Sequence, residues 1–457
     1  MHIHILGICG TFMGSLALLA KQAGHQVSGS DANVYPPMST QLANSGIDLI
    51  EGFDPKQLHS APDLIVVGNA ISRGNLCVEY MLDNRLPYIS GPQWLGEHIL
   101  RYKHVLSVSG THGKTTTSSM LTKILDDADL KPGFLIGGIP EDFGISARLS
   151  ESEYFVVEAD EYDSAFFDKR SKFVHYFSDT VIINNLEFDH ADIFDDLTSI
   201  QKQFHHLLRT VPSSGSLIAP EGSDAIDLVI NMGCWSQKHY FGKRPDLPWC
   251  YNLLEEDGSK FEIVFSNGVE IERAIVSWKH TGEHNVTNGM AAVIAAHQVG
   301  VSVEKACEAL SSFIGVKRRM EVIYSDTKTT IYDDFAHHPT AIKTTLDGLR
   351  AKVGDGFILA IIEPRSATMK MGIHSDSLAS SVVSADQVFW YQNDSTSWDM
   401  ETLKENSPIP SMLITNLQKL IDLSISTFKS NTHIVIMSNG GFEGFHIKLV
   451  KALKRLK

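Results

Sequence analysis

The sequence has few cysteines and no surplus of positive charge. Cysteine accounts for 5 of the 457 residues, with no CxxC pair. The five are Cys9, Cys77, Cys234, Cys250 and Cys307. An odd number of scattered cysteines argues against a disulfide framework or a cysteine-rich zinc site, and it favours a reducing cytoplasm. The formal net charge is −15, which argues against nucleic acid as a partner, because phosphate-binding surfaces are basic.

Long apolar runs and a leader segment are also missing. The first residues, Met-His-Ile-His-Ile-Leu-Gly, lack the basic stretch and apolar core of a signal peptide. No apolar run approaches the roughly 18 residues that a membrane helix needs, so membrane insertion is not expected. Hydrophobic residues make up 43% and charged residues 20%, which is ordinary for a globular protein. At roughly 100–200 residues per domain, the length allows two to four domains.

Short apolar strands alternate with helical segments, which predicts an α/β fold with mainly parallel sheets. The expected strands are His2–Leu6, Leu64–Val67, Val105–Ser109, Tyr154–Glu158, Val181–Ile183, Phe357–Ile362 and Gln387–Tyr391. Lys260–Phe265 and Val269–Val276 flank Ser-Asn-Gly and predict an antiparallel hairpin at the edge of the middle domain. We place the domain boundaries near residues 103 and 315, which gives domains over 1–103, 104–315 and 316–457.

A glycine-rich turn between a strand and a helix is the strongest local motif. It reads Gly110-Thr111-His112-Gly113-Lys114-Thr115-Thr116. Backbone N–H groups at such a turn bind phosphate oxygens, and the helix N-terminus favours negative charge. Lys114 can reach the outer phosphates of a nucleotide, and the Thr115 hydroxyl can bind Mg²⁺. Val108 stands where the longer Walker pattern has glycine, so the alternative is a glycine-rich turn with an incidental lysine.

Two acidic segments follow strands in the same predicted domain. They are Val156–Glu161, which contains Glu158, and Asn184–Asp192, which contains His190. Carboxylates at the carboxyl ends of parallel strands face the ligand crevice, and Mg²⁺ prefers oxygen ligands. Thr115 and Glu158 are therefore candidate metal ligands, and His190 binds the metal or positions a carboxylate. The alternative for each segment alone is a solvated loop or a helix cap.

Polar residues elsewhere suggest nucleotide contacts without naming a ligand. The segment His280–Asn288 precedes an alanine-rich helix; its asparagines can pair with an adenine edge or cap the helix. In the first domain, Gly7, Gly10 and Gly14 form an imperfect glycine turn without the G-x-G-x-x-G spacing. Asp31 follows the next expected strand, where an acidic residue can bind a hydroxyl or a base.

The third predicted domain offers two further clusters. Asp334, His337 and His338 follow the expected strand Thr330–Tyr332. The histidine pair has no third metal ligand at a telling spacing, and such a pair is more often a helix-cap feature. Arg365 and Lys370 follow the strand Phe357–Ile362, and we expect them to anchor substrate carboxylates.

The order of these motifs along the chain resembles that of the Mur ligases. The resemblance covers essentially the whole chain and rests on Gly110–Thr116, Glu158, the stretch Asn185-Leu-Glu-Phe-Asp-His190, His284-Asn285 and Asp334. It implies three domains: a Rossmann-like N-terminal domain for a UDP-sugar, a P-loop central ATPase domain, and a Rossmann-like C-terminal domain that presents an amine. It implies ATP and Mg²⁺ as cofactors and an ATP-dependent ligase that forms a C–N bond through an acyl phosphate.

The same resemblance assigns roles to residues. Lys114 would contact the outer phosphates within the loop Gly110–Thr116, and Thr115, Glu158 and His190 would hold Mg²⁺. Adenosine would be bound by His284, Asn285 and Asn288. Either Arg318 or Arg319, of which we favour Arg319, would close onto ATP with Asp334. The residues implied for the UDP-sugar and the amine substrate are Gly7, Gly10, Gly14, Ser30, Asp31, His337, His338, Arg365 and Lys370.

Within the family, three segments resemble the branch that joins UDP-N-acetylmuramate to the cell-wall tripeptide L-Ala-γ-D-Glu-meso-diaminopimelate during peptidoglycan recycling. They are Gly7–Gly14, Glu161-Tyr-Asp163 and Glu363-Pro-Arg-Ser366. The first alternative is the branch that adds L-alanine to the same donor. Two broader alternatives are an NAD-dependent oxidoreductase, suggested by the first glycine turn, and a nucleotide-binding switch protein without ligase chemistry.

Overall fold

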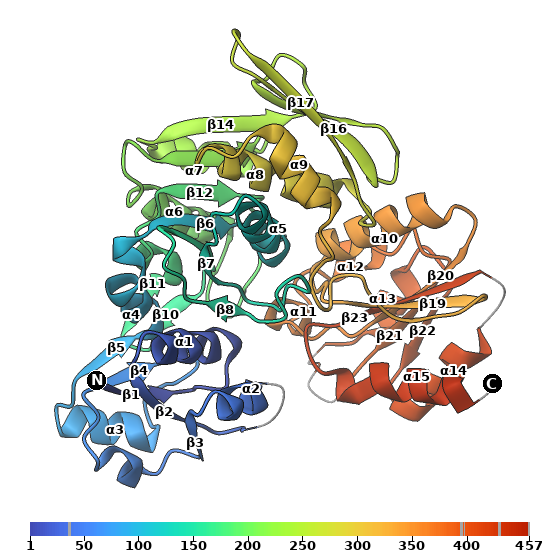
Figure 1. The fold of residues 1–457 in the computed structure, drawn as a ribbon. Coiled ribbons are helices and arrows are strands. Elements are labelled where there is room, and N and C mark those ends of the chain that lie inside the picture. The colour runs from blue at the N-terminus through green and yellow to red at the C-terminus, as the bar shows by residue number, and fades with distance from the viewer. Residues whose placement is uncertain (35–37, 394–395, 397, 428–430, 456–457) are drawn as a thin grey trace.

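The computed structural model describes residues 1–34, 38–393, 396, 398–427 and 431–455. Within them the chain folds into three α/β bodies, and the N-terminal and C-terminal bodies both lie against the central one (Figure 1). In this described part, no helix combines the length and the apolar character needed to cross a membrane.

The N-terminal body contains a five-stranded parallel sheet. Its elements are β1 (His2–Leu6), α1 (Thr11–Gln22), β2 (Gln26–Asp31), α2 (Met38–Asn44), β3 (Asp48–Glu51), η1 (Pro55–Leu58), β4 (Leu64–Val67), α3 (Leu76–Asp83), β5 (Tyr88–Ser90), α4 (Gly91–His98) and η2 (Leu100–Tyr102). The strand order is β3-β2-β1-β4-β5. Side chains of a strand alternate between faces, so Ile3 and Ile5 pack with Leu16 of α1, while Leu6 joins Ile65 in the opposite core.

The central body is built on a ten-stranded sheet. Its elements are β6 (His104–Ser109), α5 (Lys114–Asp127), β7 (Gly133–Leu135), β8 (Ala147–Arg148), β9 (Tyr154–Glu158), β10 (Asp163–Ala165), β11 (Asp168–Ser171), η3 (Lys172–His175), β12 (Thr180–Ile183), α6 (Leu197–Leu208), β13 (Ser216–Pro220), α7 (Asp224–Met232), β14 (Gln237–Gly242), β15 (Trp249–Leu253), β16 (Lys260–Ser266), β17 (Ile271–Ser277), α8 (Glu283–His297) and α9 (Val303–Ser311). The order is β17-β16-β15-β14-β13-β12-β6-β9-β7-β8. Leu106 and Val156 pack against α5 and α8, whereas Val105 and Phe155 pack on the side of α6 and α7.

The predicted hairpin is confirmed at one edge of this sheet. Strands β16 and β17 pair antiparallel, with Lys260 opposite Ser277 and Ser266 opposite Ile271. The second strand begins two residues later than expected, at Ile271 instead of Val269. The hairpin projects from the end of the molecule that lies away from the N-terminal body (Figure 1), and it extends one edge of the sheet.

The C-terminal body contains a six-stranded sheet. Its elements are β18 (Glu321–Ser325), β19 (Thr329–Asp334), α10 (Pro339–Val353), β20 (Phe357–Ile362), α11 (Ala367–Lys370), α12 (Ser375–Ser380), β21 (Gln387–Tyr391), α13 (Glu401–Asn406), β22 (Ser411–Ile414), α14 (Leu417–Ser426), β23 (Thr432–Met437), η4 (Phe442–Gly444) and α15 (Phe445–Arg455). The order is β18-β19-β23-β20-β21-β22, and only β18 runs antiparallel to its neighbour. Asp334 was expected just after a strand, but it is the last residue of β19.

The ten-stranded sheet explains why the predicted site residues of the central body can meet. Parallel strands of one sheet end at the same edge, and ligands bind outside that edge. The ends of β6, β9 and β12 are adjacent because β6 lies between the other two. The linker between α9 and β18 then carries the chain from this edge into the C-terminal body. The exact domain boundaries near residues 103 and 315 stay predictions.

Candidate active site

The loop between β6 and α5 has a backbone that favours glycine at two positions. Gly110 and Gly113 have φ angles of +125° and +81°, which L side chains rarely adopt. A Cβ atom on Gly113 would lie 2.5 Å from Oδ1 of Asn288 in α8. The first N–H groups of α5 have no partners inside the helix. The loop therefore presents a helix N-terminus that suits a phosphate group.

The segment after β12 braces this loop. The N–H of Thr111 donates to the carbonyl oxygen of Asn185 at 3.2 Å, and the N–H of His112 donates to Oδ1 of Asn185 at 2.8 Å. Asn184 Nδ2 donates to Thr117 Oγ1 at 2.9 Å. The acidic residues of this segment made it a candidate site, but its asparagines fix the shape of the loop.

The Lys114 ammonium group is folded back onto the loop. Its Nζ donates to the carbonyl oxygens of Gly110 and Thr111, at 2.6 and 3.2 Å, and to Oε2 of Glu161 at 2.9 Å. Burial opposes the charge, but the carboxylates of Glu161 and Asp160 outweigh it and raise the pKa of Lys114. Lys114 therefore keeps its charge at neutral pH beside the N-terminus of α5.

Two of the three candidate metal ligands lie together. Thr115 Oγ1 donates to Oε1 of Glu158 at 3.0 Å, and the N–H of Gly137 donates to Oε2 at 2.7 Å. Burial raises the pKa of Glu158. A divalent cation beside this hydroxyl and carboxylate would offset the cost of burying the negative charge, and an oxygen donor set suits Mg²⁺.

The third candidate, His190, contacts a different carboxylate. Its Nε2 lies 3.0 Å from Oε1 of Glu161. Burial opposes the charged imidazole, but Glu161 outweighs it and raises the pKa of His190. Burial alone would raise the pKa of Glu161, yet Lys114 and His190 hold it well below its ordinary value. Glu161 thus links Lys114 to His190, a role that the sequence analysis did not assign.

The residues proposed for adenosine lie inside α8 and not before it. Gly282 is the N-cap of this helix, so the alternative that Asn285 or Asn288 caps the helix is wrong. Asn285 Nδ2 donates to the carbonyl oxygen of Thr281 at 2.7 Å, and Asn288 touches the phosphate loop as described above. Burial lowers the pKa of His284 to about 4, so its ring is neutral at neutral pH.

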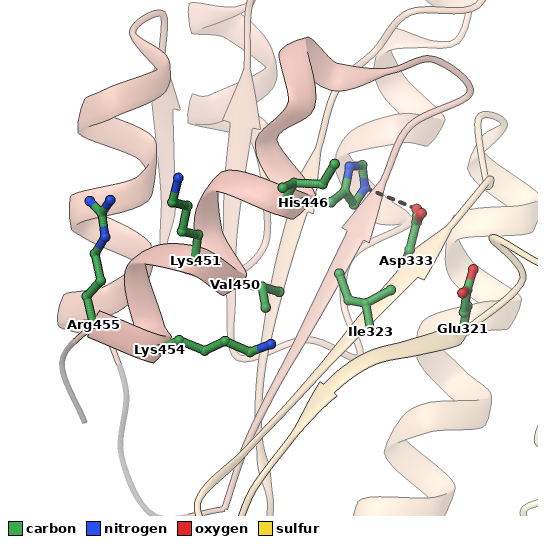
Figure 2. Close-up of a pocket in the computed structure, with 9 residues that line it drawn as sticks. Glu321, Ile323, Asp333, His446, Val450, Lys451, Lys454 and Arg455 are labelled. Carbon is green, nitrogen blue, oxygen red and sulfur yellow. Dashed lines mark ion pairs between the residues drawn. The ribbon is translucent and has the colours of Figure 1, made fainter. Parts of the chain in front are cut away.

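Two nitrogens of the Arg318 guanidinium hold the linker between the central and C-terminal bodies. Its Nη2 donates to the carbonyl oxygens of Ser438 and Gly440 at 2.7 and 2.8 Å, and its Nε donates to Oδ2 of Asp333 at 3.2 Å. The other carboxylate oxygen of Asp333, Oδ1, lies 3.0 Å from Nε2 of His446. Both residues line a cavity of about 600 Å³ between α15 and β18 (Figure 2). These contacts leave the neighbouring Arg319 as the arginine that can turn towards a ligand.

Arg319 stands between the two bodies that the linker joins. Its guanidinium carbon lies 4.9 Å from the centre of the Phe335 ring. Burial lowers the pKa of Arg319, while the charges of Asp334 and Glu158 support its protonated form. Asp334 accepts the N–H of Met320 at 2.8 Å. This geometry is compatible with the expected closure of Arg319 and Asp334 onto a nucleotide.

The histidine pair and Thr368 of the C-terminal body contact the segment that follows β12. Thr368 Oγ1 donates to Oδ1 of Asp189 at 2.7 Å, and His337 Nε2 lies 3.9 Å from the other oxygen of Asp189. Burial lowers the pKa of His337 to about 4. His338 caps α10 with Nδ1, which confirms the helix-cap alternative for this residue, and its Nε2 donates to the carbonyl oxygen of Phe188 at 3.3 Å.

Arg365 and Lys370 lie on the loop and short helix that follow β20. Arg365 is exposed, and its guanidinium packs on Gly440, where any Cβ atom would overlap it. Lys370 ends α11 and is half-buried.

Residues of the first glycine turn gather at the carboxyl ends of β1 and β2. Asp31 Oδ2 accepts the N–H of Cys9 at 2.9 Å, and the N–H of Gly7 donates to the carbonyl oxygen of Ser30 at 2.8 Å. The Ser30 side chain is fully buried, and Gly10 is the N-cap of α1. These contacts hold the backbone of the turn and the Asp31 carboxylate together at the edge of the sheet where ligands of parallel α/β sheets bind.

Two features of this face have no signal in the sequence. Gly14, which was expected in the glycine turn, lies inside α1 and makes room for α2, because a Cβ atom there would overlap the sulfur of Met38. Lys172 is buried, and its Nζ donates to Oδ2 of Asp160 at 3.1 Å and lies 5.2 Å from the centre of the Phe12 ring. Lys172 thus places a positive charge between the N-terminal body and the acidic end of β9.

Comparison with known proteins decides the family. The family models of the Mur ligase catalytic domain, the Mur ligase middle domain and the Mur ligase glutamate ligase domain match residues 2–103, 108–296 and 318–440. The chain belongs to the Mur ligase family. The expected three-domain α/β fold is thereby confirmed, and the oxidoreductase and switch-protein alternatives are wrong, because members of this family are ligases that form amide bonds.

This Mur ligase is similar to proteins of two branches. It is 53% identical over 454 residues to the UDP-N-acetylmuramate–L-alanyl-γ-D-glutamyl-meso-2,6-diaminoheptandioate ligase of Haemophilus influenzae, with 99% of each chain covered. It is 31% identical over 378 residues to the UDP-N-acetylmuramate–L-alanine ligase of Syntrophomonas wolfei, which covers 81% of this chain and 78% of that one. A crystal structure of a murein peptide ligase from Psychrobacter arcticus matches with a TM-score of 0.77 and 48% identity, covering 99% of this chain and 98% of that one.

Proposed function

We infer that this Mur ligase joins UDP-N-acetylmuramate to the tripeptide L-Ala-γ-D-Glu-meso-diaminopimelate, with ATP as the energy source, in peptidoglycan recycling. The observation that carries this inference is the 53% identity to the tripeptide-adding relative over 99% of both chains. Identity to the alanine-adding relative is 31% over 81% of the chain, so that alternative is the weaker one. The substrates and the scattered free cysteines fit a cytoplasmic enzyme.

The reaction brings together anions that repel each other. The lactyl carboxylate of UDP-N-acetylmuramate attacks the γ-phosphate of ATP, which gives an acyl phosphate and releases ADP. The alanyl amine of the tripeptide then attacks the acyl carbon, loses a proton and displaces phosphate, which leaves the amide. Positioning and charge compensation are therefore the main tasks of the protein. The N–H groups at the start of α5 and the Lys114 ammonium supply positive charge at the phosphates. Glu161 keeps Lys114 charged and oriented.

The residues around Glu158 fit Mg²⁺. Thr115 and Glu158 would hold the ion, and His190 would act on it directly or through Glu161. When bound, Mg²⁺ would neutralise part of the phosphate charge, in addition to Lys114 and the loop amides. Arg319 and Asp334 would approach the nucleotide from the C-terminal body.

His337 is the better of the two histidine candidates for the base that accepts the amine proton. Both ring nitrogens of His338 are engaged, by the N-terminus of α10 and by the carbonyl oxygen of Phe188. His337 Nδ1 lies 2.9 Å from the carbonyl oxygen of Phe335, so this nitrogen carries the hydrogen and Nε2 has its lone pair free. The neutral ring can therefore accept a proton at Nε2.

The choice of acceptor tests the proposed function. At saturating ATP and UDP-N-acetylmuramate, kcat/KM for the tripeptide should exceed that for L-alanine by on the order of 10³-fold or more, because a site built for several carboxylates loses those contacts with a single amino acid. Both values can be measured by ADP release in the same assay. A kcat/KM higher for L-alanine would assign the chain to the alanine-adding branch.

Arg365 should contribute to peptide binding and not to ATP binding. A guanidinium binds a carboxylate through two parallel hydrogen bonds, so Arg365→Ala should raise KM for the tripeptide by on the order of 10-fold and leave KM for ATP unchanged. Arg365→Lys keeps the charge but cannot form two parallel hydrogen bonds, so its KM for the tripeptide should lie between those of the wild type and Arg365→Ala. Gly440→Ala is a matched test, since its methyl group would displace the guanidinium. An unchanged KM for peptide in all three variants would contradict the role.

A further inference from the structure

Three side chains from two bodies converge beside the phosphate loop, although no sequence spacing links them. His112, Glu187 and His338 each offer one nitrogen or oxygen atom, and these atoms all lie within 4.8 Å of one another. Nε2 of His112 lies 3.1 Å and Nδ1 of His338 lies 3.4 Å from the same oxygen, Oε2 of Glu187. The sequence alone shows no third metal ligand for the pair His337-His338. The fold, however, brings two candidate ligands from the central body, His112 and Glu187, next to His338.

The orientation of His338 is the one that metal binding requires. Its Nε2 faces the carbonyl oxygen of Phe188 at 3.3 Å; a carbonyl can only accept, so Nε2 carries the hydrogen and Nδ1 has the lone pair. Metal-binding histidines commonly donate their second ring N–H to a carbonyl or carboxylate in this way. Nδ1 accepts only a long 3.3 Å hydrogen bond from the N–H of Thr340, which coordination of a metal ion would replace. Burial and the neighbouring His112 lower the pKa of His338, so the ring is neutral.

Glu187 completes an electron-rich cluster. Burial would raise its pKa, but the contact with His112 outweighs burial and holds the pKa of Glu187 below its ordinary value. The ionised carboxylate therefore faces the lone pair of His338 Nδ1. A cation between these atoms would replace a repulsive contact by two coordination bonds. The Glu187 side chain is 36% exposed and the His112 side chain 17%, so an ion can enter from solvent.

We propose that His112, Glu187 and His338 form a binding site for a divalent transition-metal ion of the Zn²⁺ type. Two imidazoles and one carboxylate are a ligand set that Zn²⁺ accepts, with a fourth position left for water or a substrate oxygen. Mg²⁺ prefers all-oxygen shells, so the site differs in chemistry from the Thr115 and Glu158 pair.

The site has a mechanical consequence because its ligands span two bodies. His112 belongs to the phosphate loop and Glu187 to the segment after β12, while His338 begins α10 of the C-terminal body. A bound ion ties the C-terminal body to the phosphate loop. It therefore stabilises the arrangement described here against opening of the linker.

A neighbouring histidine provides the matched control. His374 Nε2 also lies near the carbonyl oxygen of Phe188, at 3.1 Å, and its ring lies 4.7 Å from that of His338. His374 is not one of the three clustered ligands. Replacing it removes an imidazole and a contact between the two bodies while leaving the proposed ligand set intact.

The test is metal binding by the full chain without a polyhistidine tag, nucleotide or Mg²⁺. We expect one Zn²⁺ per chain by calorimetry, and Co²⁺ in the same site should give the intense visible absorption of a low-coordinate ion. His338→Ala and Glu187→Gln should weaken Zn²⁺ binding by at least ~10-fold. His374→Ala and Glu158→Gln should bind as the wild type does, which separates this site from the candidate Mg²⁺ ligands.

A second readout covers the case in which one variant folds poorly. An ion that binds only the folded chain raises the melting temperature, so Zn²⁺ should raise it for the wild type and His374→Ala and not for Glu187→Gln, which keeps the shape of the side chain. Equal Zn²⁺ affinity in the wild type and both ligand variants, or a loss confined to Glu158→Gln, would overturn the proposal. Neither readout needs turnover, so both are independent of the acceptor that the ligase uses.

Discussion

Replacing Lys114 by alanine should lower the ligation rate by ~10²–10³, the usual cost of losing one group that stabilises developing charge. Lys114 places its ammonium at the start of α5, and the carboxylates around it keep it protonated. The loss should appear in kcat at saturating ATP and UDP-N-acetylmuramate, measured by ADP release. A folded Lys114→Ala protein with near-normal turnover would remove Lys114 from the phosphate site.

The controls for this variant follow from its buried partner. Glu161 is 2% exposed, and removing one member of a buried ion pair costs ~3–5 kcal/mol of stability. In Lys114→Ala the buried Glu161 carboxylate is left unpaired, and adding Glu161→Gln removes that charge. If Lys114 acts on phosphate, the double variant should regain the melting temperature lost in Lys114→Ala but not the activity. Lys123→Ala removes a lysine from the same helix, paired with Asp127, and should leave the rate nearly unchanged.

Glu158→Gln should have the second large effect, a fall of on the order of 10²-fold in rate at limiting Mg²⁺. Glutamine keeps the shape of the side chain but lacks the charge that a divalent ion would neutralise beside Thr115. The Mg²⁺ concentration for half activation should rise, while the Kd for UDP-N-acetylmuramate should stay the same. Both quantities can be measured by titration, the first by activity and the second by calorimetry.

A matched variant and a chelator complete this test. Glu153→Gln changes an exposed carboxylate just before the same strand, β9, and should leave Mg²⁺ activation as it is. Excess chelator should abolish ligation by the wild type. If ligation continued at full rate under chelation, the assignment of Thr115 and Glu158 as metal ligands would be wrong.

Local sequence patterns correctly predicted strands and turns whose conformation is set by residues only a few positions apart. The strands His2–Leu6 and Tyr154–Glu158 and the turn Gly110–Gly113 follow from apolar runs and glycines within a few residues. Errors arose where an element continued past its apolar core. Asp334 still pairs with its neighbour strand, opposite Met437, so β19 extends over polar residues that pattern reading had placed outside it.

Contacts between distant segments were beyond sequence reasoning. Thr368 reaches Asp189 across 179 positions, and no local signal marks either residue as the partner of the other. Lys172 was missed because a lysine is usually exposed, whereas this one is buried. Glu161 lay within a flagged segment, but only the fold shows that it stands between Lys114 and His190.

The most direct test of the central claim is a product assay with ATP, UDP-N-acetylmuramate and the tripeptide. The account predicts that ADP is formed only when all three are present, and that mass spectrometry finds a UDP-linked product whose mass is the sum of the UDP-sugar and the tripeptide less one water. Release of ADP with no such amide product, or an equal rate of ADP release without the UDP-sugar, would contradict the assignment of this chain as the tripeptide-adding Mur ligase.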